Sequence, residues 1–235
     1  MTEFVFMLTR DDRTVADAHA VLDRIAPIGL RHIGFKDVGL SFVELKDLAR
    51  RIRELGARSY LEVVGLDDER HSIEAAVDLG VDVVLGGTQV TEGVKVLDGT
   101  TIEYWPFPGR VEGHPSVLRG ELREIVASAK EIAATPGVRG LDLLAYRFDG
   151  DAPALAAAVV EAVDMPVLAA GSVDRVERIE ALRRANVWGF TVGTAILDGT
   201  FRIDAPQRTV EGLLSAVLDA TASKTSSSQV PDIFL

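Results

Sequence analysis

Cysteine is absent from the 235 residues of this sequence, which excludes disulfides, thiolate metal ligands and a cysteine nucleophile. Long uncharged runs are scarce as well. Residues 186–197 form one of the longest, well short of the roughly 18 to 20 apolar residues of a membrane-spanning helix. The start, Met1-Thr2-Glu3-Phe4, lacks the basic leader of a secretory signal. We therefore expect no transmembrane segment, no signal peptide and a cytoplasmic location.

Positive charge is in deficit, because 25 Lys and Arg face 36 Asp and Glu, which gives a formal net charge of −11. Such an acidic chain repels a phosphate backbone, so nucleic acid is not an expected partner. Histidine is also scarce, with four residues and no His-x-His or His-Glu-x-x-His spacing. The sequence predicts no cofactor and no histidine metal site, and it leaves open an all-oxygen magnesium site built from carboxylates.

What the chain does contain is an alternation of β-rich runs and helical patterns from one end to the other. The expected strands are residues 4–8, 31–36, 59–64, 81–85, 100–104, 140–144, 166–170 and 188–192. Apolar residues recur at helical spacing at Val15, Ala18, Leu22 and Ile25, at Leu45, Leu48, Ile52 and Leu55, and at Leu122, Ile125, Ala129 and Ile132. About eight such units predict an α/β fold, a (β/α)8 TIM barrel of parallel strands, with an open doubly wound sheet as the alternative.

The ends of several elements carry their own signals. Ser41 with Glu44, and Asp174 with Glu177, have capping-box spacing at the start of a helix. Residues 88–116 show little helical pattern, and we expect a long active-site loop there. With 47% hydrophobic residues, the chain can form one core, which predicts a single domain over residues 1–222. Residues 223–235 form a tail whose apolar end is hypothesised to dock on a neighbouring copy in a homo-oligomer.

An internal repeat supports the barrel, because residues 61–93 align with residues 167–199 at a constant offset without a gap. Four matched positions are Gly65 with Gly171, Asp68 with Asp174, Gly87-Thr88 with Gly193-Thr194, and Gly93 with Gly199. Glycines at strand ends match by chance less readily than hydrophobic residues do. The repeat indicates two half-barrels, and the alternative is that similar βα units share packing demands.

Two of these glycines mark a predicted phosphate site. Gly171-Ser172 and Gly193-Thr194 stand at the ends of the seventh and eighth expected strands, where a barrel can expose backbone N–H groups and a short helix to an anion. Glycine lets the phosphate approach the backbone closely, and each hydroxyl adds a hydrogen bond. The simpler interpretation is that these glycines only turn the chain.

Residues 165–173 and 187–199 resemble the C-terminal phosphate-binding region of the ribulose-phosphate-binding barrels, in particular the two histidine-biosynthesis barrels, an isomerase and a cyclase. Residues 79–88 resemble the first-half counterpart of that region, so the resemblance implies a second phosphate position at Gly87 and Thr88. Those enzymes have catalytic aspartates at the end of the first strand and after the fifth. Here Thr9 stands at the first position and Glu103-Tyr104-Trp105 in the fifth strand, so neither histidine-pathway reaction is transferred.

Alternation along the strands predicts which polar side chains point into the barrel. It places Lys36 of the second strand, Glu62 of the third, Glu103 of the fifth and Asp142 of the sixth inside. We interpret these four as catalytic, with Lys36 as proton donor or electrophile, Glu62 setting its charge, and Asp142 or Glu103 taking a proton. Two alternatives stay open, a buried Lys36–Glu62 ion pair that serves only structure and a Schiff-base lysine.

Other residues are candidates for binding the substrate, namely Thr9 and Arg10 after the first strand, Gly87 and Thr88 after the fourth, and Arg147 after the sixth. The leading hypothesis is an enzyme that acts on a small phosphorylated sugar or sugar-derived acid. Its reaction would be an isomerisation, an epimerisation or a carbon–carbon lyase reaction through an enediolate-like intermediate. The alternative is a non-catalytic regulatory barrel that senses a phosphorylated metabolite, which fold alone does not exclude.

Overall fold

The computed structural model describes residues 2–63, 68–113 and 115–222. Within them, an eight-stranded sheet runs in the order β10-β11-β12-β1-β4-β5-β6-β7, and every pairing in it is parallel. Its strands are β1 (Glu3–Met7), β4 (His32–Lys36), β5 (Arg58–Glu62), β6 (Val83–Leu85), β7 (Glu103–Trp105), β10 (Leu141–Leu143), β11 (Val167–Ala169) and β12 (Gly189–Val192). All eight coincide with expected strands, within a few residues at each end.

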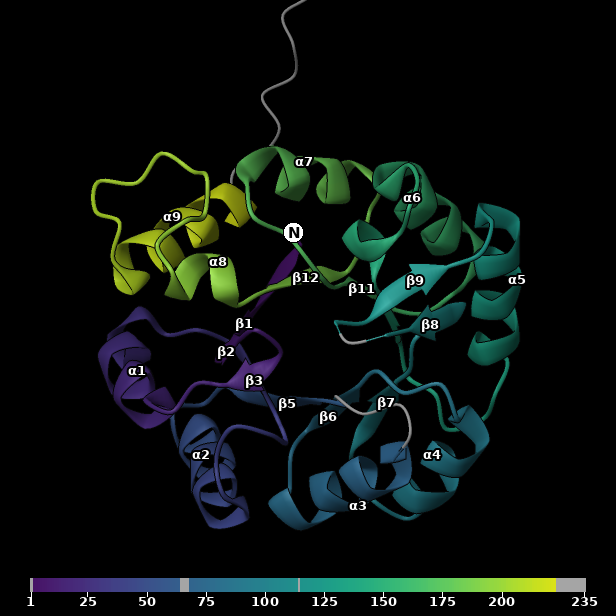
Figure 1. The fold of residues 1–235 in the computed structure, drawn as a ribbon, viewed down its shortest axis with the longest axis horizontal. Helices are drawn as coiled ribbons and strands as arrows, with labels where there is room; N and C mark the ends of the chain where they lie inside the picture. The colour runs from purple at the N-terminus through teal and green to yellow at the C-terminus, as the bar shows by residue number, and fades with distance from the viewer. Residues whose placement is uncertain (1, 64–67, 114, 223–235) are drawn as a thin grey trace, which may run out of the picture.

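Backbone hydrogen bonds join the two ends of this sheet. Arg139 N donates to Tyr104 O at 3.0 Å, and Asp142 N donates to Pro106 O at 3.0 Å. Tyr104 and Val138 form a parallel bridge at the same seam. These contacts close the sheet into a barrel, so the predicted TIM barrel is confirmed and the open-sheet alternative is wrong (Figure 1).

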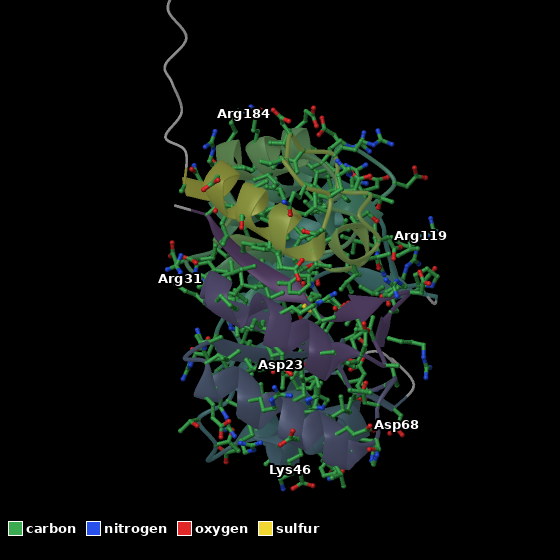
Figure 2. All side chains as sticks on the ribbon, turned by 90° about the vertical axis from the view of Figure 1, so that its left-hand side faces the viewer. Asp23, Arg31, Lys46, Asp68, Arg119 and Arg184 are labelled. Carbon is green, nitrogen blue, oxygen red and sulfur yellow. The ribbon has the colours of Figure 1, made fainter. Side chains whose placement is uncertain are left out.

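Helices surround the barrel on its outside (Figure 1). They are α1 (Ala18–Ile25), α2 (Phe42–Glu54), α3 (Glu69–Leu79), α4 (Val90–Leu97), α5 (Leu122–Ala133), α6 (Ala152–Ala162), α7 (Val176–Arg184), α8 (Thr194–Leu197) and α9 (Val210–Ala222), with short 3-10 turns η1 (Ala26–Ile28) and η3 (Ala145–Arg147). Their apolar stripes face the strands, as Leu45, Leu48 and Ile52 of α2 do. Charged side chains such as Arg31, Lys46 and Arg184 point outward (Figure 2).

Two expectations about local structure need correction. The predicted capping box at Ser41 and Glu44 is present, but Asp174 does not cap α7, which begins after Arg175 without a side-chain cap. The Asp174 carboxylate binds Arg175 and Arg178 instead. Residues 88–116 are also not one long loop, because α4 occupies residues 90–97.

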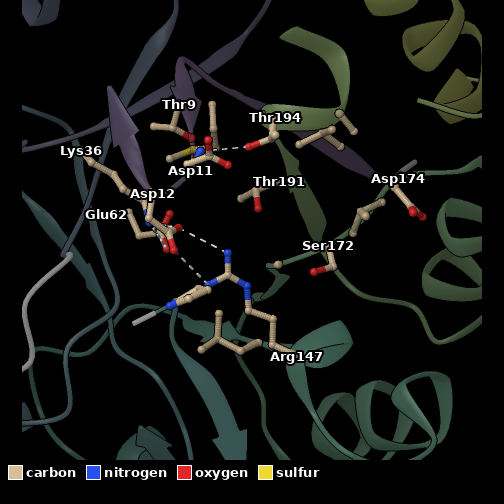
Figure 3. A pocket seen from close by; sticks show the side chains of 18 of the residues that line it. Thr9, Asp11, Asp12, Lys36, Glu62, Arg147, Ser172, Asp174, Thr191 and Thr194 are labelled. Carbon is tan, nitrogen blue, oxygen red and sulfur yellow. Dashed lines mark hydrogen bonds and ion pairs between the residues drawn. The ribbon is translucent and has the colours of Figure 1, made fainter. Parts of the chain in front are cut away.

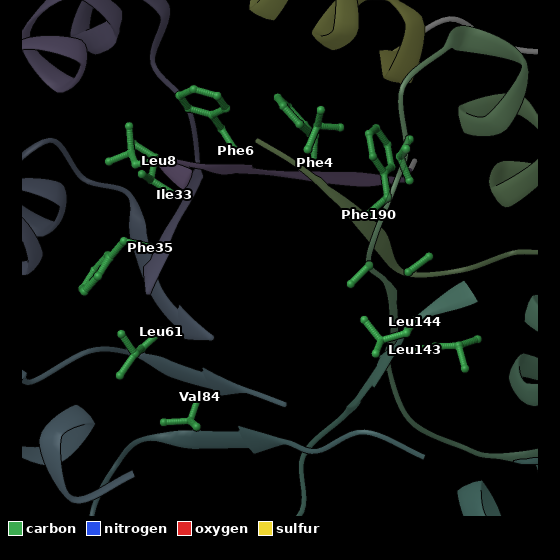
Figure 4. Close-up of a cluster of buried hydrophobic side chains, with 14 of the residues drawn as sticks. Phe4, Phe6, Leu8, Ile33, Phe35, Leu61, Val84, Leu143, Leu144 and Phe190 are labelled. Carbon is green, nitrogen blue, oxygen red and sulfur yellow. The ribbon is translucent and has the colours of Figure 1, made fainter. Parts of the chain in front are cut away.

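The strands divide the core into two parts, as alternation predicts. Phe6, Ile33, Phe35 and Leu61 point outward and pack under the helices (Figure 4). A separate cluster fills the barrel, namely Val5, Met7, Tyr60, Val83, Leu85, Trp105 and Leu168. Each large side chain buried in this way contributes about 1.5 to 3 kcal/mol.

Polar and aromatic groups fill the N-terminal end of the barrel. His32 Nε2 lies 3.1 Å from Glu3 Oε2, and its Nδ1 lies 2.9 Å from the Tyr60 hydroxyl. The rings of Trp105 and Trp188 meet edge to face with centroids 4.9 Å apart. The C-terminal end is the other mouth of the barrel, and two antiparallel hairpins lie there, β2 (Thr9–Arg10) with β3 (Arg13–Thr14) and β8 (Arg110–Glu112) with β9 (Val117–Arg119).

The two repeated sequences form equivalent units on opposite sides of the barrel. Residues 61–93 run from the end of β5 through α3 and β6 into α4, and residues 167–199 run from β11 through α7 and β12 to α8. In Figure 1, α3 and α7 lie at opposite edges of the molecule. Gly65, one of the matched glycines, and the tail at residues 223–235 lie outside the described residues.

Candidate active site

A cavity of 370 Å³ opens at the C-terminal end of the barrel. Side chains from β1, the β2–β3 turn, β4, β5, η3 and the loops after β11 and β12 line it (Figure 3). Among the predicted site residues, the lining contains Thr9, Lys36, Glu62, Arg147, Gly171, Ser172, Gly193 and Thr194. The structure thus brings together the predicted polar pair and both predicted phosphate-binding loops.

Lys36 and Glu62 are the last residues of adjacent strands and are register partners. Lys36 Nζ lies 3.3 Å from Glu62 Oε1, and the two side chains are only 5% and 12% exposed. Nζ also donates to Asp12 Oδ1 at 2.7 Å. Because an ammonium group has three donors, one remains for a bound ligand.

Asp12 is the member of this cluster that sequence reasoning missed. It stands with Asp11 at the tip of the β2–β3 hairpin, where Arg10 pairs with Arg13 and leaves a two-residue turn. Both aspartates have positive φ, 49° and 57°, as a type I′ turn requires. A signal was present, because Thr-Arg-Asp-Asp-Arg-Thr over residues 9–14 is symmetric about the two turn residues, as a tight hairpin can be.

The hairpin is fixed on the barrel by Thr14. Its hydroxyl donates to Lys36 O at 2.7 Å and accepts from Lys36 N at 2.9 Å. These bonds hold the turn over β4 and place the Asp12 carboxylate beside Nζ of Lys36. The position of Asp12 therefore depends on the short hairpin between β1 and α1.

Arg147 connects this cluster with the glycine loops. Its Nη2 lies 3.3 Å from Asp12 Oδ1, and its Nη1 donates to Ser116 O at 3.2 Å. A Cβ on Gly171 would lie 2.8 Å from Arg147 Cγ, so glycine is needed where the arginine crosses the loop. Arg147 thus stands between the Asp12 carboxylate and the predicted phosphate site (Figure 3).

The charged groups in this cluster shift one another's pKa values. Burial alone would lower the pKa of Lys36, but Glu62 and Asp12 outweigh it and hold that pKa above its usual value. Burial raises the pKa of Asp12, and Lys36 and Arg147 bring it below the usual value. The amine of Lys36 is therefore charged at neutral pH, which disfavours the Schiff-base alternative because that chemistry needs a neutral amine.

Asp142 lies inside the barrel, as predicted, but outside the cavity lining. It is 0% exposed, and neither carboxylate oxygen has a hydrogen-bond partner in the described part of the chain. Burial, followed by the nearby Glu62 carboxylate, raises the pKa of Asp142 well above its usual value. Asp142 is thus a carboxyl group whose surroundings favour the protonated form.

The glycine loops carry backbone N–H groups that are not used. Within residues 2–63, 68–113 and 115–222, no hydrogen bond employs the N–H of Gly171, Ser172, Gly193 or Thr194. A Cβ on Gly193 would lie 2.7 Å from Thr9 O, so only glycine lets β2 and this loop approach so closely. Four such amides, on residues that line one cavity, form a donor surface of the kind that binds anions.

Two further predicted residues, Glu103 and Arg10, do not join this site. Glu103 points inward but at the N-terminal end, where it pairs with Arg58 at 2.9 Å and accepts from Trp105 Nε1 at 3.0 Å. Arg10 binds Asp198 at 2.6 Å beside α8. The convergence of Glu103 with Lys36 and Glu62 is therefore wrong, because alternation fixes the face of a strand but not the height along the barrel.

Gly87 and Thr88 are also absent from the cavity lining. Thr88 N donates to both oxygens of Glu69 at 2.8 Å, so this loop is occupied by a side chain of the protein itself.

No group of three or more His, Asp or Glu side chains in the described ranges could hold a metal ion. None of the helices described is long and apolar enough to span a bilayer.

Comparison of the sequence with known proteins identifies distant relatives, and no family model matches the chain. It is 30% identical over 151 residues to the 1-(5-phosphoribosyl)-5-((5-phosphoribosylamino)methylideneamino)imidazole-4-carboxamide isomerase of Halobacterium salinarum, covering 58% of this chain and 61% of that enzyme. The enzyme of the same name from Methanothrix thermoacetophila is 29% identical over 165 residues, covering 61% and 64%. The chain thus spans less than two thirds of the length of these relatives.

Solved structures extend the likeness of fold over nearly the whole chain. Orotidine 5′-phosphate decarboxylase from Pyrococcus horikoshii superimposes with a TM-score of 0.68 at 15% identity, covering 94% of this chain and 100% of that one. Phosphoribosylanthranilate isomerase from Thermotoga maritima gives 0.63 at 12% identity, covering 95% and 100%. In fold and in this partial sequence match, the chain resembles the ribulose-phosphate-binding barrels, and among them the histidine-biosynthesis isomerase.

Proposed function

We propose that this chain is an isomerase-type enzyme for a small phosphorylated metabolite, a phosphosugar or sugar-derived acid bound in the cavity at the C-terminal end of the barrel. The observation that carries the proposal is the composition of that single cavity, which joins unused amides on two loops to a buried acid–base cluster. The distant relatives are isomerases with phosphoribosyl groups in their substrate name, which supports the same class of reaction.

The phosphate is assigned to the amides of Gly171, Ser172, Gly193 and Thr194. The hydroxyls of Ser172 and Thr194 add donors at the same place, and Arg147 adds a positive charge on the neighbouring side. A local donor surface is needed because the chain as a whole carries a net charge of −11 and repels anions. Binding the phosphate there places the rest of a small substrate against Lys36, Asp12 and Glu62.

The acid–base cluster fits an isomerisation through an enediolate. One carboxylate, Asp12 or Glu62, takes a proton from the carbon next to the carbonyl group, so that the C–H bond breaks and a C=C bond forms. The Lys36 ammonium donates a hydrogen bond to the carbonyl oxygen, where negative charge develops. The proton then adds to the former carbonyl carbon, while the hydroxyl on the deprotonated carbon gives its proton to the enolate oxygen and becomes the new carbonyl, so atoms and electrons balance without an oxidant.

Asp142 has a supporting part in this proposal, because it does not line the cavity. When it is protonated, it adds no second negative charge beside Glu62. The two positive charges of Lys36 and Arg147 then balance the two negative charges of Asp12 and Glu62. A carbon–carbon lyase would use the same enediolate, with a C–C bond breaking in place of the C–H bond.

The test begins with a thermal-shift screen of phosphorylated sugars and sugar acids. A ligand at one hundred times its Kd stabilises the folded state by about 2.7 kcal/mol. For a domain of this size each kcal/mol raises the Tm by roughly 2 to 4 °C. Each hit is then incubated with enzyme in D₂O and followed by proton NMR, because reversible proton abstraction exchanges the α-hydrogen for deuterium.

We expect exchange with the wild type and with Glu161→Gln, an exposed carboxylate on α6 that serves as a matched control. Glu62→Gln and Lys36→Met should each lower the exchange rate by about 10² to 10⁴. Binding without exchange or cleavage would support the regulatory barrel instead. If no phosphorylated compound stabilises the protein, the phosphate site itself is wrong.

A further inference from the structure

The two halves of the barrel carry the same Gly-Thr pair. In the first half a side chain of the protein accepts the hydrogen bonds of the pair's loop, and in the second half no such group does so among the described residues. Gly87-Thr88 follows β6 as Gly193-Thr194 follows β12, and the two pairs match in the internal repeat. From sequence alone, each pair is a candidate phosphate position. The difference between them is the group that accepts their hydrogen bonds.

In the first half, that group is the carboxylate of Glu69, the first residue of α3. It accepts from Thr88 N at 2.8 Å, from the Thr88 hydroxyl at 2.6 Å and from Gln89 N at 2.7 Å. Glu69 is 0% exposed. Two backbone amides and a hydroxyl around two oxygens form the kind of arrangement that would hold the oxygens of a phosphate.

In the second half, the position that matches Glu69 is Arg175. Arg175 pairs with Asp174 at 2.8 Å, and within the described residues no hydrogen bond or ion pair joins it to the Gly193-Thr194 loop, whose amides stay unused there. The charge at the matched position is therefore reversed. An internal anion occupies one loop, and the other loop faces the cavity.

Close packing holds in place the loop after β6, which carries Gly87 and Thr88. Gly86 and Gly87 both have positive φ, 81° and 84°. A Cβ on Gly86 would lie 2.7 Å from the Phe107 ring, and one on Gly87 would lie 2.7 Å from the Tyr104 hydroxyl. The two glycines therefore lie tightly against β7 and the segment after it, while Thr88 borders two other cavities, separate from the one at the C-terminal end of the barrel.

We infer that the substrate carries a single phosphate, bound by the second half of the barrel, and that the Glu69 carboxylate takes the place of a second phosphate in the first half. This inference rests on the function proposed above and narrows its substrate class. The named substrate of the distant relatives contains two phosphoribosyl groups. The present chain differs from them in the number of phosphates it can hold.

The experiment counts inorganic phosphate bound per chain by equilibrium dialysis, taken to saturation. Three proteins are compared, the wild type, Glu69→Ala and Glu74→Ala. Glu74 lies on the same helix, pairs with Arg70 on the surface and changes the net charge by the same amount. It is therefore a matched control for the loss of one negative charge.

We expect one phosphate per chain for the wild type and for Glu74→Ala, and two for Glu69→Ala, because that change frees the amides of Thr88 and Gln89. Two phosphates on the wild type would overturn the inference and leave the proposed function in place. A single phosphate on folded Glu69→Ala would also overturn it, since Glu69 would then not be what closes the site. No phosphate on the wild type would refute the proposed function itself. If Glu69→Ala does not fold, the wild-type count decides alone.

Discussion

Replacing Asp142 by asparagine should stabilise this protein, and the gain should grow as the pH rises. Asp142 is fully buried and both of its oxygens are unpartnered among the described residues. Burial and then Glu62 raise its pKa well above the usual value of 3.8. Asparagine has the same shape and is neutral at every pH, so it removes the cost of ionising this site without opening a cavity.

The sign and size of this pH dependence of the free energy of unfolding follow from proton linkage. Between the unfolded-state pKa near 4 and the raised folded-state pKa, the folded chain holds a proton that the unfolded chain has lost. Wild-type stability therefore falls with rising pH through this residue, by about 1.4 kcal/mol for each pH unit. The difference between Asp142→Asn and wild type should widen by about 1.4 kcal/mol for each pH unit between those two pKa values.

Urea denaturation followed by tryptophan fluorescence, repeated from pH 4 upward, measures this difference directly. Asp164→Asn, an exposed aspartate after α6, controls for the loss of a carboxyl group and should track the wild type. Parallel stability curves for Asp142→Asn and wild type would refute the argument. They would mean that the Asp142 carboxyl is ionised in the folded protein and that its burial is compensated by contacts other than those described.

Three further changes test other parts of the structure. Lys36→Met should cost about 3 to 5 kcal/mol in urea denaturation by leaving the buried Glu62 carboxylate unpaired and Asp12 with Arg147 alone, and adding Glu62→Gln should recover part of that loss. Burial lowers the pKa of His32, so wild-type Tm should fall as pH drops below 6.5, when the unfolded imidazole takes up a proton; in His32→Gln this dependence should be shallower. Gly171→Ala should weaken phosphate binding about tenfold or more in calorimetry at a stability cost near 1 kcal/mol, because its φ is 79° and the new methyl meets Arg147.

The barrel was accessible from the sequence because its determinants are local. Strand and helix periods repeat along the chain, and glycines mark where the segments end. The sequence did not predict helix α4, and the reason lies in tertiary packing. Gly93 lies inside that helix, where glycine is a poor helix former, but a Cβ there would lie 2.6 Å from the Tyr104 ring. Close packing against Tyr104 therefore explains why α4 contains Gly93, a residue whose low helix propensity argued against a helix there.

Site residues were predicted correctly where strand alternation alone determines the position of the side chain. They were missed where that position depends on the geometry of several residues. Lys36 and Glu62 end neighbouring strands, so a period of two placed both correctly. Glu103 obeys the same rule but begins its strand, which puts it at the opposite end of the barrel. Asp12 enters through a hairpin whose turn is visible in residues 9–14 but whose direction depends on Thr14 binding the β4 backbone.

The repeated Gly-Thr pairs show why a motif does not by itself define a binding site. Both pairs stand where a barrel strand gives way to the following helix, so each gives the backbone a similar opportunity to bind an anion. Whether an external anion is needed depends on a residue that the motif does not include. Glu69 supplies the anion from within the first half, whereas Arg175 at the matched position cannot. A duplicated barrel can in this way lose a ligand position by one change of charge and keep its fold, because the carboxylate makes the hydrogen bonds that the loop requires.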